Sequence, residues 1–420
     1  QNIYILGIGD TARIATVSGK IEVTFKHEFP FMNTNQLPTD KIKPDTDLIL
    51  QILAEATISR IDKSKPSFLF HSAGKDSNSI ALALAEAGWQ DRVTLITHKS
   101  KGMADESKIS EKIAKQLGFK HQILHGVDQL QTSHKKLIKE YFTKVPFPCV
   151  DMVTLAYPIY LEQLPELKHS NIIDGGGNDS YMIIPSTQRE LRTIFLSRSI
   201  SQLSLMRKFI NSESIFNPLL RTPAEWYGMA GLSLKDANKI FPNNQSVYPH
   251  WSRESNLRKK WDTFYFKTDI LASITVPEVH IRKARNFADS VGSNLILPFA
   301  NQKLAEYFNK LPETYLFNRK QLKNKIILRE ILKSQIGLDS DKLGKMGWVY
   351  DSRNIVLQNW IYIMIEIQAC KLWCQVDLLK ILNRMRNRMN GKGWGAIASG
   401  RYIYRIYLIS SWYNNNKYLA

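Results

Sequence analysis

The sequence predicts an α/β protein built on a parallel sheet with helices on both faces. Between residue 46 and about residue 180, compact apolar strands alternate with helical segments. This alternation is typical of parallel strands joined by right-handed crossover helices. A mostly helical region follows from about residue 190, and a small β element occupies the first 45 residues. We therefore expect three parts, at 1–45, 46–350 and 351–420.

The first part is expected to consist of short strands. Tyr4–Leu6, Ile14–Val17 and Ile21–Phe25 are rich in β-prone residues, and Ser18-Gly19-Lys20 has the composition of a turn. This pattern predicts a small antiparallel element rather than a domain with a core of its own.

In the second part, Gly-rich segments directly follow two of the predicted strands. Strands are expected at 67–71, 93–98, 120–124 and 171–174, and helices at 47–61, 77–87 and 105–117. The two Gly-rich segments are 72–77 and 175–179. Because ligands bind at the carboxyl ends of parallel strands, both segments should meet at one ligand-binding edge.

The remainder is predicted to be helical. The clearest helical segments are 203–211, 255–272, 301–311 and 323–334, with more helix after residue 351. An aromatic stripe lies near the end of the chain, and such a stripe usually packs in a core. Its members are Tyr402, Tyr404, Tyr407, Trp412 and Tyr413.

Composition narrows the class of protein. The net charge of +19 suits an anionic partner, but the basic residues are scattered and accompany no nucleic-acid-binding motif. The three cysteines make no disulfide framework. No apolar run approaches the roughly 20 residues that span a bilayer, and no signal-peptide pattern is present. A cytoplasmic protein without a membrane span is expected, and nucleic acid is an improbable partner.

The segment Ser72-Ala73-Gly74-Lys75-Asp76-Ser77 has the chemistry of a phosphate loop. Small residues allow a phosphate close to the backbone, and amides at a helix N-terminus point at it. A carboxylate in such a loop makes sense if it holds Mg²⁺. The segment resembles the Ser-Gly-Gly-x-Asp-Ser loop of the PP-loop ATP pyrophosphatases, with Ala73 in place of the first glycine.

Five further segments resemble the synthetase domain of asparagine synthetases, in that family's order. They are Asp105–His121, Asp174–Asp179, Leu297–Glu306, the Lys325–Glu330 helix and the Lys345–Trp348 loop. The resemblance covers roughly residues 46 to 350. It implies an ATP-dependent ligase that adenylates a carboxylate, releases pyrophosphate and forms an amide.

The resemblance also implies roles for individual residues, with ATP and Mg²⁺ as cofactors. Asp76 and Asp179 would hold Mg²⁺. The loop Ser72, Ala73, Gly74, Lys75 and Ser77 would bind pyrophosphate. Ile96 and His98 would lie beside adenine, and Gly175, Gly176 and Gly177 would let the nucleotide approach closely. Lys345 would stabilise the transition state, and Lys325 would contact phosphate.

The sequence departs from the family pattern where the base that assists the nucleophile is expected. Gly176 stands where asparagine synthetases have Glu and β-lactam synthetases have Tyr, and Ser180 replaces the Glu that ends the motif. Glu278, His280 and Tyr181 are candidates for this role, without a spacing argument for any of them.

The family's catalytic N-terminal cysteine is also absent, since no cysteine precedes Cys149. Ammonia would then come from solution or a separate glutaminase, or the nucleophile would be an amine. The leading hypothesis is amidation of a carboxylate-bearing small molecule, such as a uronic acid in surface polysaccharide biosynthesis. The alternatives are a peptide or small-molecule cyclase like the lasso-peptide cyclases and β-lactam synthetases, a PP-loop RNA-modifying enzyme, or a non-catalytic nucleotide-binding module.

Overall fold

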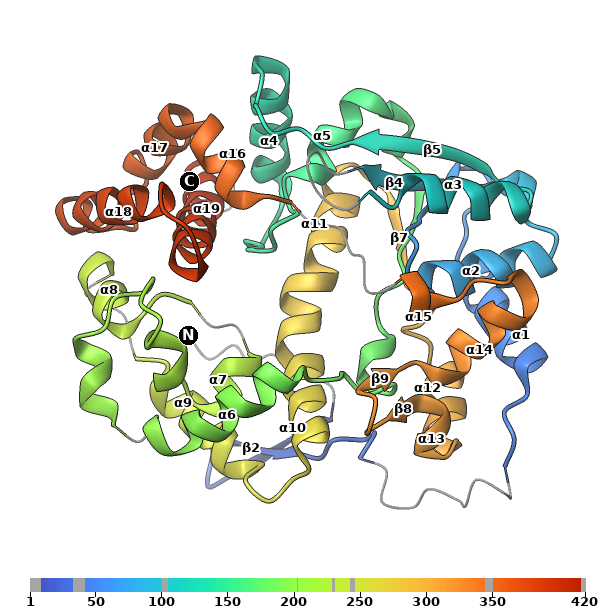
Figure 1. Ribbon diagram of the computed structural model, residues 1–420, viewed down its shortest axis with the longest axis horizontal. Helices are drawn as coiled ribbons and strands as arrows, with labels where there is room; N and C mark the ends of the chain where they lie inside the picture. Colours follow the sequence, from blue (N-terminus) through green and yellow to red (C-terminus); the bar gives the residue numbers. More distant parts are fainter. Residues whose placement is uncertain are drawn as a thin grey trace.

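The computed structural model describes residues 9–32, 42–99, 105–201, 203–228, 231–241, 246–343 and 350–416. A parallel sheet with its covering helices forms one half of the molecule, and helices form the other (Figure 1). Among the described helices, none is both long enough and apolar enough to cross a bilayer. The α/β fold class is confirmed.

The sheet has five parallel strands in the order β5-β4-β3-β6-β7. Their bounds are β3 (Ser67–Phe70), β4 (Val93–Lys99), β5 (Lys120–His125), β6 (Asn171–Ile173) and β7 (Asn294–Ile296). Sequence analysis predicted four of these strands and missed β7, which has only three residues and follows a long helical stretch. β3 and β6 are neighbours near the centre of the sheet and run in the same direction. The Gly-rich loops that follow them therefore lie at the same edge.

Alternate side chains of the strands serve two cores, one on each face of the sheet. Leu69, Leu95 and Ile173 face one core, which they share with helices from before and after the central strands. These helices are α1 (Thr46–Ile58), α2 (Lys75–Glu86), α3 (Ser107–Gln116), α12 (Gln302–Lys310) and α14 (Ile326–Ile336). Successive side chains of a strand point to opposite faces of the sheet, so a sheet that is covered on both faces buries all of them.

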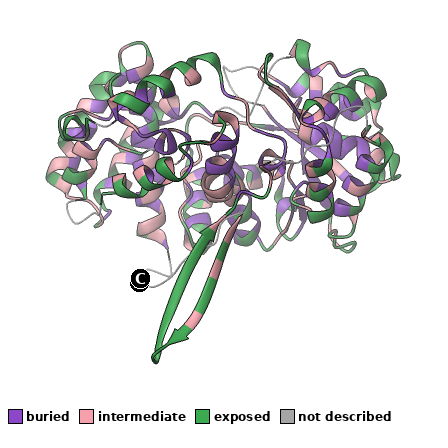
Figure 2. Ribbon diagram, turned by 90° about the horizontal axis from the view of Figure 1, so that it is seen from below, coloured by how far each residue is buried: buried purple, intermediate pink, exposed green. Residues whose placement is uncertain are grey.

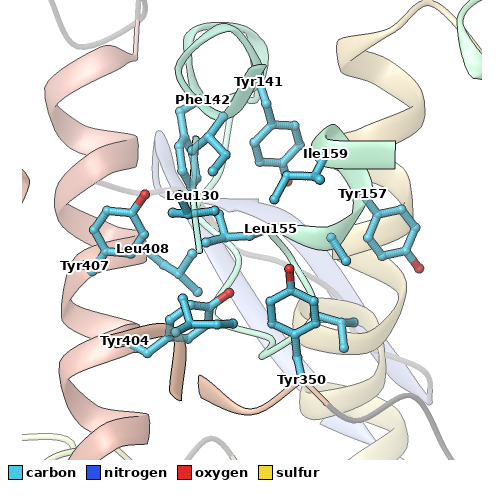
Figure 3. Packing of buried hydrophobic residues seen from close by; sticks show 14 of the residues in the cluster. Leu130, Tyr141, Phe142, Leu155, Tyr157, Ile159, Tyr350, Tyr404, Tyr407 and Leu408 are labelled. Atoms are coloured by element: carbon cyan, nitrogen blue, oxygen red, sulfur yellow. The ribbon is translucent and has the colours of Figure 1, made fainter. Parts of the chain in front are cut away.

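The other face, with Phe68, Phe70 and Ile172, packs on helices that include the C-terminal region. The helices are α4 (Thr132–Lys144), α5 (Ala156–Gln163), α11 (Arg282–Ser290), α16 (Ser352–Gln358), α17 (Trp360–Gln368), α18 (Gln375–Met389) and α19 (Trp394–Asn415). Figure 3 shows Tyr404 and Tyr407 of α19 among side chains of α4 and α5. The prediction that the aromatic stripe packs in a core is confirmed for these two residues and Tyr402. The boundary at residue 350 stays a prediction.

One long helical run separates the sheet from a lobe of short helices (Figure 1). The run consists of α10 (Thr263–Ile270), the π-helical segment η6 (Leu271–Ile281) and α11. The lobe comprises α6 (Gln188–Ile200), η4 (Ser204–Lys208), η5 (Asn217–Leu220), α7 (Pro223–Tyr227), α8 (Leu234–Ile240) and α9 (Tyr248–Leu257). A small core around Trp251 and Phe266 joins the lobe to the run.

The N-terminal element is an antiparallel hairpin of β1 (Asp10–Val17) and β2 (Lys20–His27). It projects from the body with most of its residues exposed (Figure 2). Its turn is at Ser18 and Gly19, which both have positive φ, as the turn composition predicts. The predicted strand Tyr4–Leu6 lies outside the described residues.

The remaining elements are short. They are η1 (Gln90–Arg92), η2 (Pro165–Leu167), η3 (Asn178–Ser180), α13 (Glu313–Leu316), β8 (Phe317–Asn318), β9 (Lys323–Asn324) and α15 (Ser340–Leu343).

Three predicted helices need correction. The segment 203–211 forms only the short 3₁₀ helix η4. The segment 255–272 is two helices, because Asp262 accepts hydrogen bonds from the amides of Phe264 and Tyr265 and so caps a new N-terminus. The segment 323–334 becomes helical only at Ile326, because Lys323–Asn324 pairs as β9 and Lys325 has φ +59°.

Candidate functional site

A polar cleft opens at the carboxyl ends of β3 and β6, where sequence analysis placed the ligand-binding edge. Its volume is about 270 Å³. Both Gly-rich loops line it, and η6 and α11 form the opposite wall. The lining residues are Phe70, Ser72, Gly74, Asp76, Ser77, Tyr157, Asp174, Gly175, Gly176, Gly177, Asn178, Asp179, Val276, His280, Ile281 and Lys283.

The loop after β3 is held in shape by its own hydroxyls. The Ser77 Oγ accepts a hydrogen bond from the Ser72 amide at 3.1 Å, and the Ser72 Oγ accepts one from the Gly74 amide at 3.0 Å. The Asn78 amide group donates to the carbonyls of Ser72 and Gly74 at 2.9 and 2.7 Å. No side chain caps α2 at Gly74, so its N-terminal end stays open to an anionic ligand.

The loop after β6 lies directly against this first loop. A Cβ on Gly175 would stand 3.2 Å from the Asp76 Cβ and 3.3 Å from the Ser77 nitrogen, so a larger residue would push the loops apart. Gly177 has φ +116°, which favours glycine. The Asn178 side chain donates to Asp76 Oδ1 at 2.6 Å and so joins the loops.

Lys325 supplies the positive charge that both loops share. Its Nζ lies 2.7 Å from Asp76 Oδ2, 3.0 Å from Asp179 Oδ1 and 2.9 Å from Asn178 Oδ1. The side chain comes from the start of α14, about 150 residues further along the chain than Asp179. Three separate segments therefore converge on one ammonium group.

Burial and charge act in opposite directions on Lys325. Its side chain is 7% exposed, and burial lowers the pKa of the ammonium. The carboxylates of Asp179 and Asp76 outweigh that effect and raise the pKa above its usual value. Lys325 is thus a permanent cation. Removing one partner of a buried ion pair typically costs about 3–5 kcal/mol, because the other charge is left uncompensated.

Asp174, which sequence analysis did not select, lies between the two walls of the cleft. It directly follows β6, and its Oδ1 accepts a hydrogen bond from the Gly176 amide at 2.8 Å. A Cβ on Gly176 would stand 3.1 Å from that same oxygen. The Asp174 carboxylate therefore occupies the direction in which a side chain at 176 would extend.

Burial is the main cause that raises the pKa of Asp174. The charge of Lys283 and the hydrogen bond from the Gly176 amide partly offset it, and the neighbouring Asp76 raises it further. A carboxylate whose pKa is raised is a stronger proton acceptor than an ordinary aspartate. A carboxylate directly after a buried strand was the sequence signal that could have identified it.

The opposite wall carries basic side chains. Lys283 lies 3.4 Å from Asp151, and its side chain is buried for the most part. His280 stands one helical turn earlier and lines the cleft as well. Both belong to the stretch where the long helix changes from π-helical to α-helical geometry, and such transitions are frequent at functional sites.

Four predicted nucleotide-binding residues do not line the cleft. The Ala73 amide donates to Glu106 Oε2 at 2.8 Å, and Lys75 lies on the first turn of α2 outside the lining. The Ile96 side chain is fully buried in the core. His98 is buried, and its Nδ1 shares a hydrogen bond with the Tyr160 hydroxyl. Burial lowers the pKa of His98 to about 4, so it is neutral.

The three candidate bases have different surroundings. Glu278 is paired with Arg282, and its carboxylate is not part of the cleft lining. Tyr181 donates its hydroxyl to the Phe299 carbonyl at 2.8 Å, and burial raises its pKa well above the usual value. His280 is the member of this set that lines the cleft. Lys345 lies outside the described residues.

The sequence model of asparagine synthase matches residues 48–337, which is more than half of the chain. The chain belongs to the asparagine synthase family. No curated protein matches the chain. As a member of this family the chain is an ATP-dependent amide-forming ligase at the level of reaction class, and the family uses ATP, typically with Mg²⁺.

The cleft of this family member fits a magnesium ion. Asp76 and Asp179 offer hard oxygen ligands, already hold one cation between them, and are 30% and 35% exposed. Among the described residues, no group of three His, Cys, Asp or Glu side chains converges as a metal site. Two carboxylates suit Mg²⁺, which usually takes its other ligands from water and nucleotide phosphates.

Proposed function

We propose that this family member adenylates a carboxylate with ATP and then transfers ammonia or an amine to it. A carboxylate oxygen attacks the α-phosphorus, and pyrophosphate leaves. Nitrogen then attacks the carbonyl carbon, AMP leaves, and the nitrogen loses a proton. The observation that carries the proposal is the convergence of Asp76, Asp179 and Asn178 on Lys325 at the cleft.

We assign the nucleotide's phosphates to the loop after β3. The open N-terminal end of α2 and the Ser72 and Ser77 hydroxyls provide donors there. Lys325 would orient the two carboxylates and neutralise charge as pyrophosphate leaves. Mg²⁺ held by Asp76 and Asp179 would neutralise phosphate charge.

We assign proton acceptance from the attacking nitrogen to Asp174. The side chain that assists this step in asparagine synthetases is missing at Gly176, and the Asp174 oxygen stands where it would extend. Lys283, His280, Asp76 and Tyr157 surround this carboxylate. A base at this position supports catalysis rather than mere nucleotide binding.

For the acceptor we propose a sugar uronate. The support is the pair of basic residues Lys283 and His280, which line the cleft opposite the phosphate loop and suit an anionic substrate. The run Gly176–Ser186 looks similar both to cyclase-type relatives and to relatives from polysaccharide gene clusters, so it is compatible with either activity. Amidation of a uronic acid in surface polysaccharide biosynthesis is therefore the first activity to test.

The test is pyrophosphate release from ATP and Mg²⁺, with ammonium present, across a panel of carboxylates that includes free and nucleotide-linked uronic acids. We expect release with a uronate, and its loss in Asp76→Asn and Asp179→Asn. Asp91→Asn, a change at an exposed residue outside the cleft, is the matched control and should retain activity. Release with a peptide carboxylate instead would favour a cyclase, and ATP binding without release would favour a binding module.

A further inference from the structure

Exposed hydrophobic side chains are concentrated in the segment of the lobe that runs from α6 to η5. Eight of the 23 large hydrophobic side chains that are exposed in the described residues lie between residues 195 and 216. We call these eight the outer patch: Phe195, Leu196, Leu203, Leu205, Met206, Phe209, Ile215 and Phe216. Single exposed hydrophobic residues are ordinary, but such a concentration marks an interaction surface.

The outer patch is built by elements that pack against one another. α6 contacts η5, and η4 contacts both η5 and α8. Ile194 and Ser197 face inward from α6, while Phe195 and Leu196 face outward. Phe195, Leu205 and Phe209 are 74%, 71% and 72% exposed. These side chains therefore project from a supported surface and take little part in the lobe's own core.

Basic residues accompany the outer patch. Arg192 lies three positions before Phe195 and so on the same side of α6, and Arg189, Arg198 and Lys208 are also exposed in this segment. The described acidic residues of this segment are half-buried and paired: Glu190 with Lys267, and Glu213 with Arg384. The surface is therefore apolar and positively charged.

We infer that the outer patch docks on an anionic lipid bilayer surface. Apolar side chains on one face, with Lys and Arg around them, are the features by which interfacial helices bind acidic lipid headgroups. A bilayer accepts protruding side chains of any shape and requires no matching groove. The protein would lie on the membrane and would not cross it, in agreement with the lack of a spanning helix among the described helices.

A second copy of the chain fits this surface less well. In a two-fold interface the same patch meets itself, so the basic side chains of both copies would face each other. Like charges brought together in this way oppose association. The inference does not depend on the proposed ligase activity, since it involves no residue of the cleft.

The experiment is co-sedimentation of the full chain with vesicles of about two parts phosphatidylcholine to one part phosphatidylglycerol, at roughly 0.1 M salt. Vesicles of phosphatidylcholine alone serve as the neutral reference. We expect binding to the acidic vesicles and at least about tenfold weaker binding to the neutral ones, because the basic side chains are attracted only to the anionic headgroups.

Two variants separate the apolar and the charged contributions. We expect Phe195→Ser/Leu205→Ser/Phe209→Ser and Arg189→Gln/Arg192→Gln/Arg198→Gln/Lys208→Gln each to weaken binding at least about tenfold. The matched control is Ile361→Ser/Ile365→Ser/Val376→Ser, which removes three equally exposed side chains from α17 and α18. This control should bind like the unmodified chain.

Three results would overturn the inference. One is a lack of binding to acidic vesicles. Another is binding that neither patch variant weakens, since the net charge of +19 alone would then be the cause. The third is a dimer or a complex with another protein that the triple-serine variant disrupts, in the absence of vesicle binding. Light scattering after size-exclusion chromatography detects the dimer.

Discussion

The cleft edge buries charged side chains, whereas the outer patch exposes apolar ones. At the cleft, a lysine that is 7% exposed lies within 3.0 Å of two carboxylates. On the outer patch, the side chains of Phe195, Leu205 and Phe209 are more than 70% exposed. Each arrangement is unfavourable for folding alone: a buried ion pair is costly to desolvate, and an exposed apolar side chain forgoes burial. Both are therefore places where function, rather than stability, explains the residues.

The largest effect should follow from removing the shared cation of the cleft. Lys325→Met should lower pyrophosphate release about 100- to 1,000-fold, because it removes a fixed charge from a site of developing negative charge. Lys323→Met, two residues away with a 36% exposed side chain paired with Asp341, is the control. Normal release in Lys325→Met would show that the cluster serves only the fold, as would a loss that merely follows a lower unfolding temperature.

The second test compares a core leucine with a patch leucine. Leu408→Ala should lower the free energy of unfolding by about 2–5 kcal/mol, because Leu408 is fully buried between α19 and the helices of the sheet. Leu205→Ala should change it by less than about 0.5 kcal/mol. Denaturant unfolding measures both. If Leu205→Ala lowered the free energy of unfolding as much as Leu408→Ala, Leu205 would be part of a core. The outer patch would then not be an exposed surface.

The third test concerns Asp174. Asp174→Asn should lower amide formation about 100-fold and leave adenylation, measured as exchange of pyrophosphate into ATP, nearly unchanged. Hydroxylamine is mostly unprotonated at neutral pH, so it should restore product formation as the hydroxamate. In the unmodified enzyme, amide formation should fall with decreasing pH as Asp174 protonates, at a pH above the usual range of aspartate.

Equal loss of adenylation and amide formation in Asp174→Asn would contradict that role. It would assign Asp174 to shaping the loop through its hydrogen bond with the Gly176 amide. A lack of exchange in the unmodified enzyme would count against the proposed function as a whole. The two failures are therefore distinguishable.

The smallest effect is expected at the base of the hairpin, where a polar cluster supports an exposed ribbon. His27 lies 2.7 Å from Asp10 and 2.9 Å from Asp269. The hydrogen bond to Asp269 is the main cause that raises the pKa of His27 above 6.5, against the effect of burial. The stabilisation is complete below the unfolded-state pKa and is lost as pH rises through the raised folded-state value.

His27→Gln should therefore lower the free energy of unfolding by about 1 kcal/mol or more in slightly acid solution. The decrease should become smaller as the pH rises above that range. Unfolding of both proteins across pH gives this difference. If the loss of stability in His27→Gln increased with pH instead, His27 would bind Asp10 and Asp269 as a neutral imidazole. Exchange of the hairpin's amide hydrogens shows whether the ribbon is the part released.

Sequence pattern alone predicted most of the sheet and the edge at which the cleft lies. Compact apolar runs identified four of the five strands, and the two Gly-rich segments identified the edge where Asp76 and Asp179 meet. These features are local, so a few neighbouring residues reveal them. The short strand β7 was missed because three residues in a long helical stretch carry too little periodicity.

Contacts between distant segments required the tertiary structure. Lys325 reaches Asp76 across 249 positions of sequence, and its left-handed backbone conformation replaces the helix that periodicity predicts there. The turn after β6 places the Asp174 carboxylate close to where a Cβ at position 176 would stand. The outer patch likewise needed the fold, because hydrophobic residues at helical spacing predict a buried face. The local sequence thus determined which reactive and charged side chains the protein carries. Tertiary packing determined which of these side chains contact one another and which stay exposed to solvent.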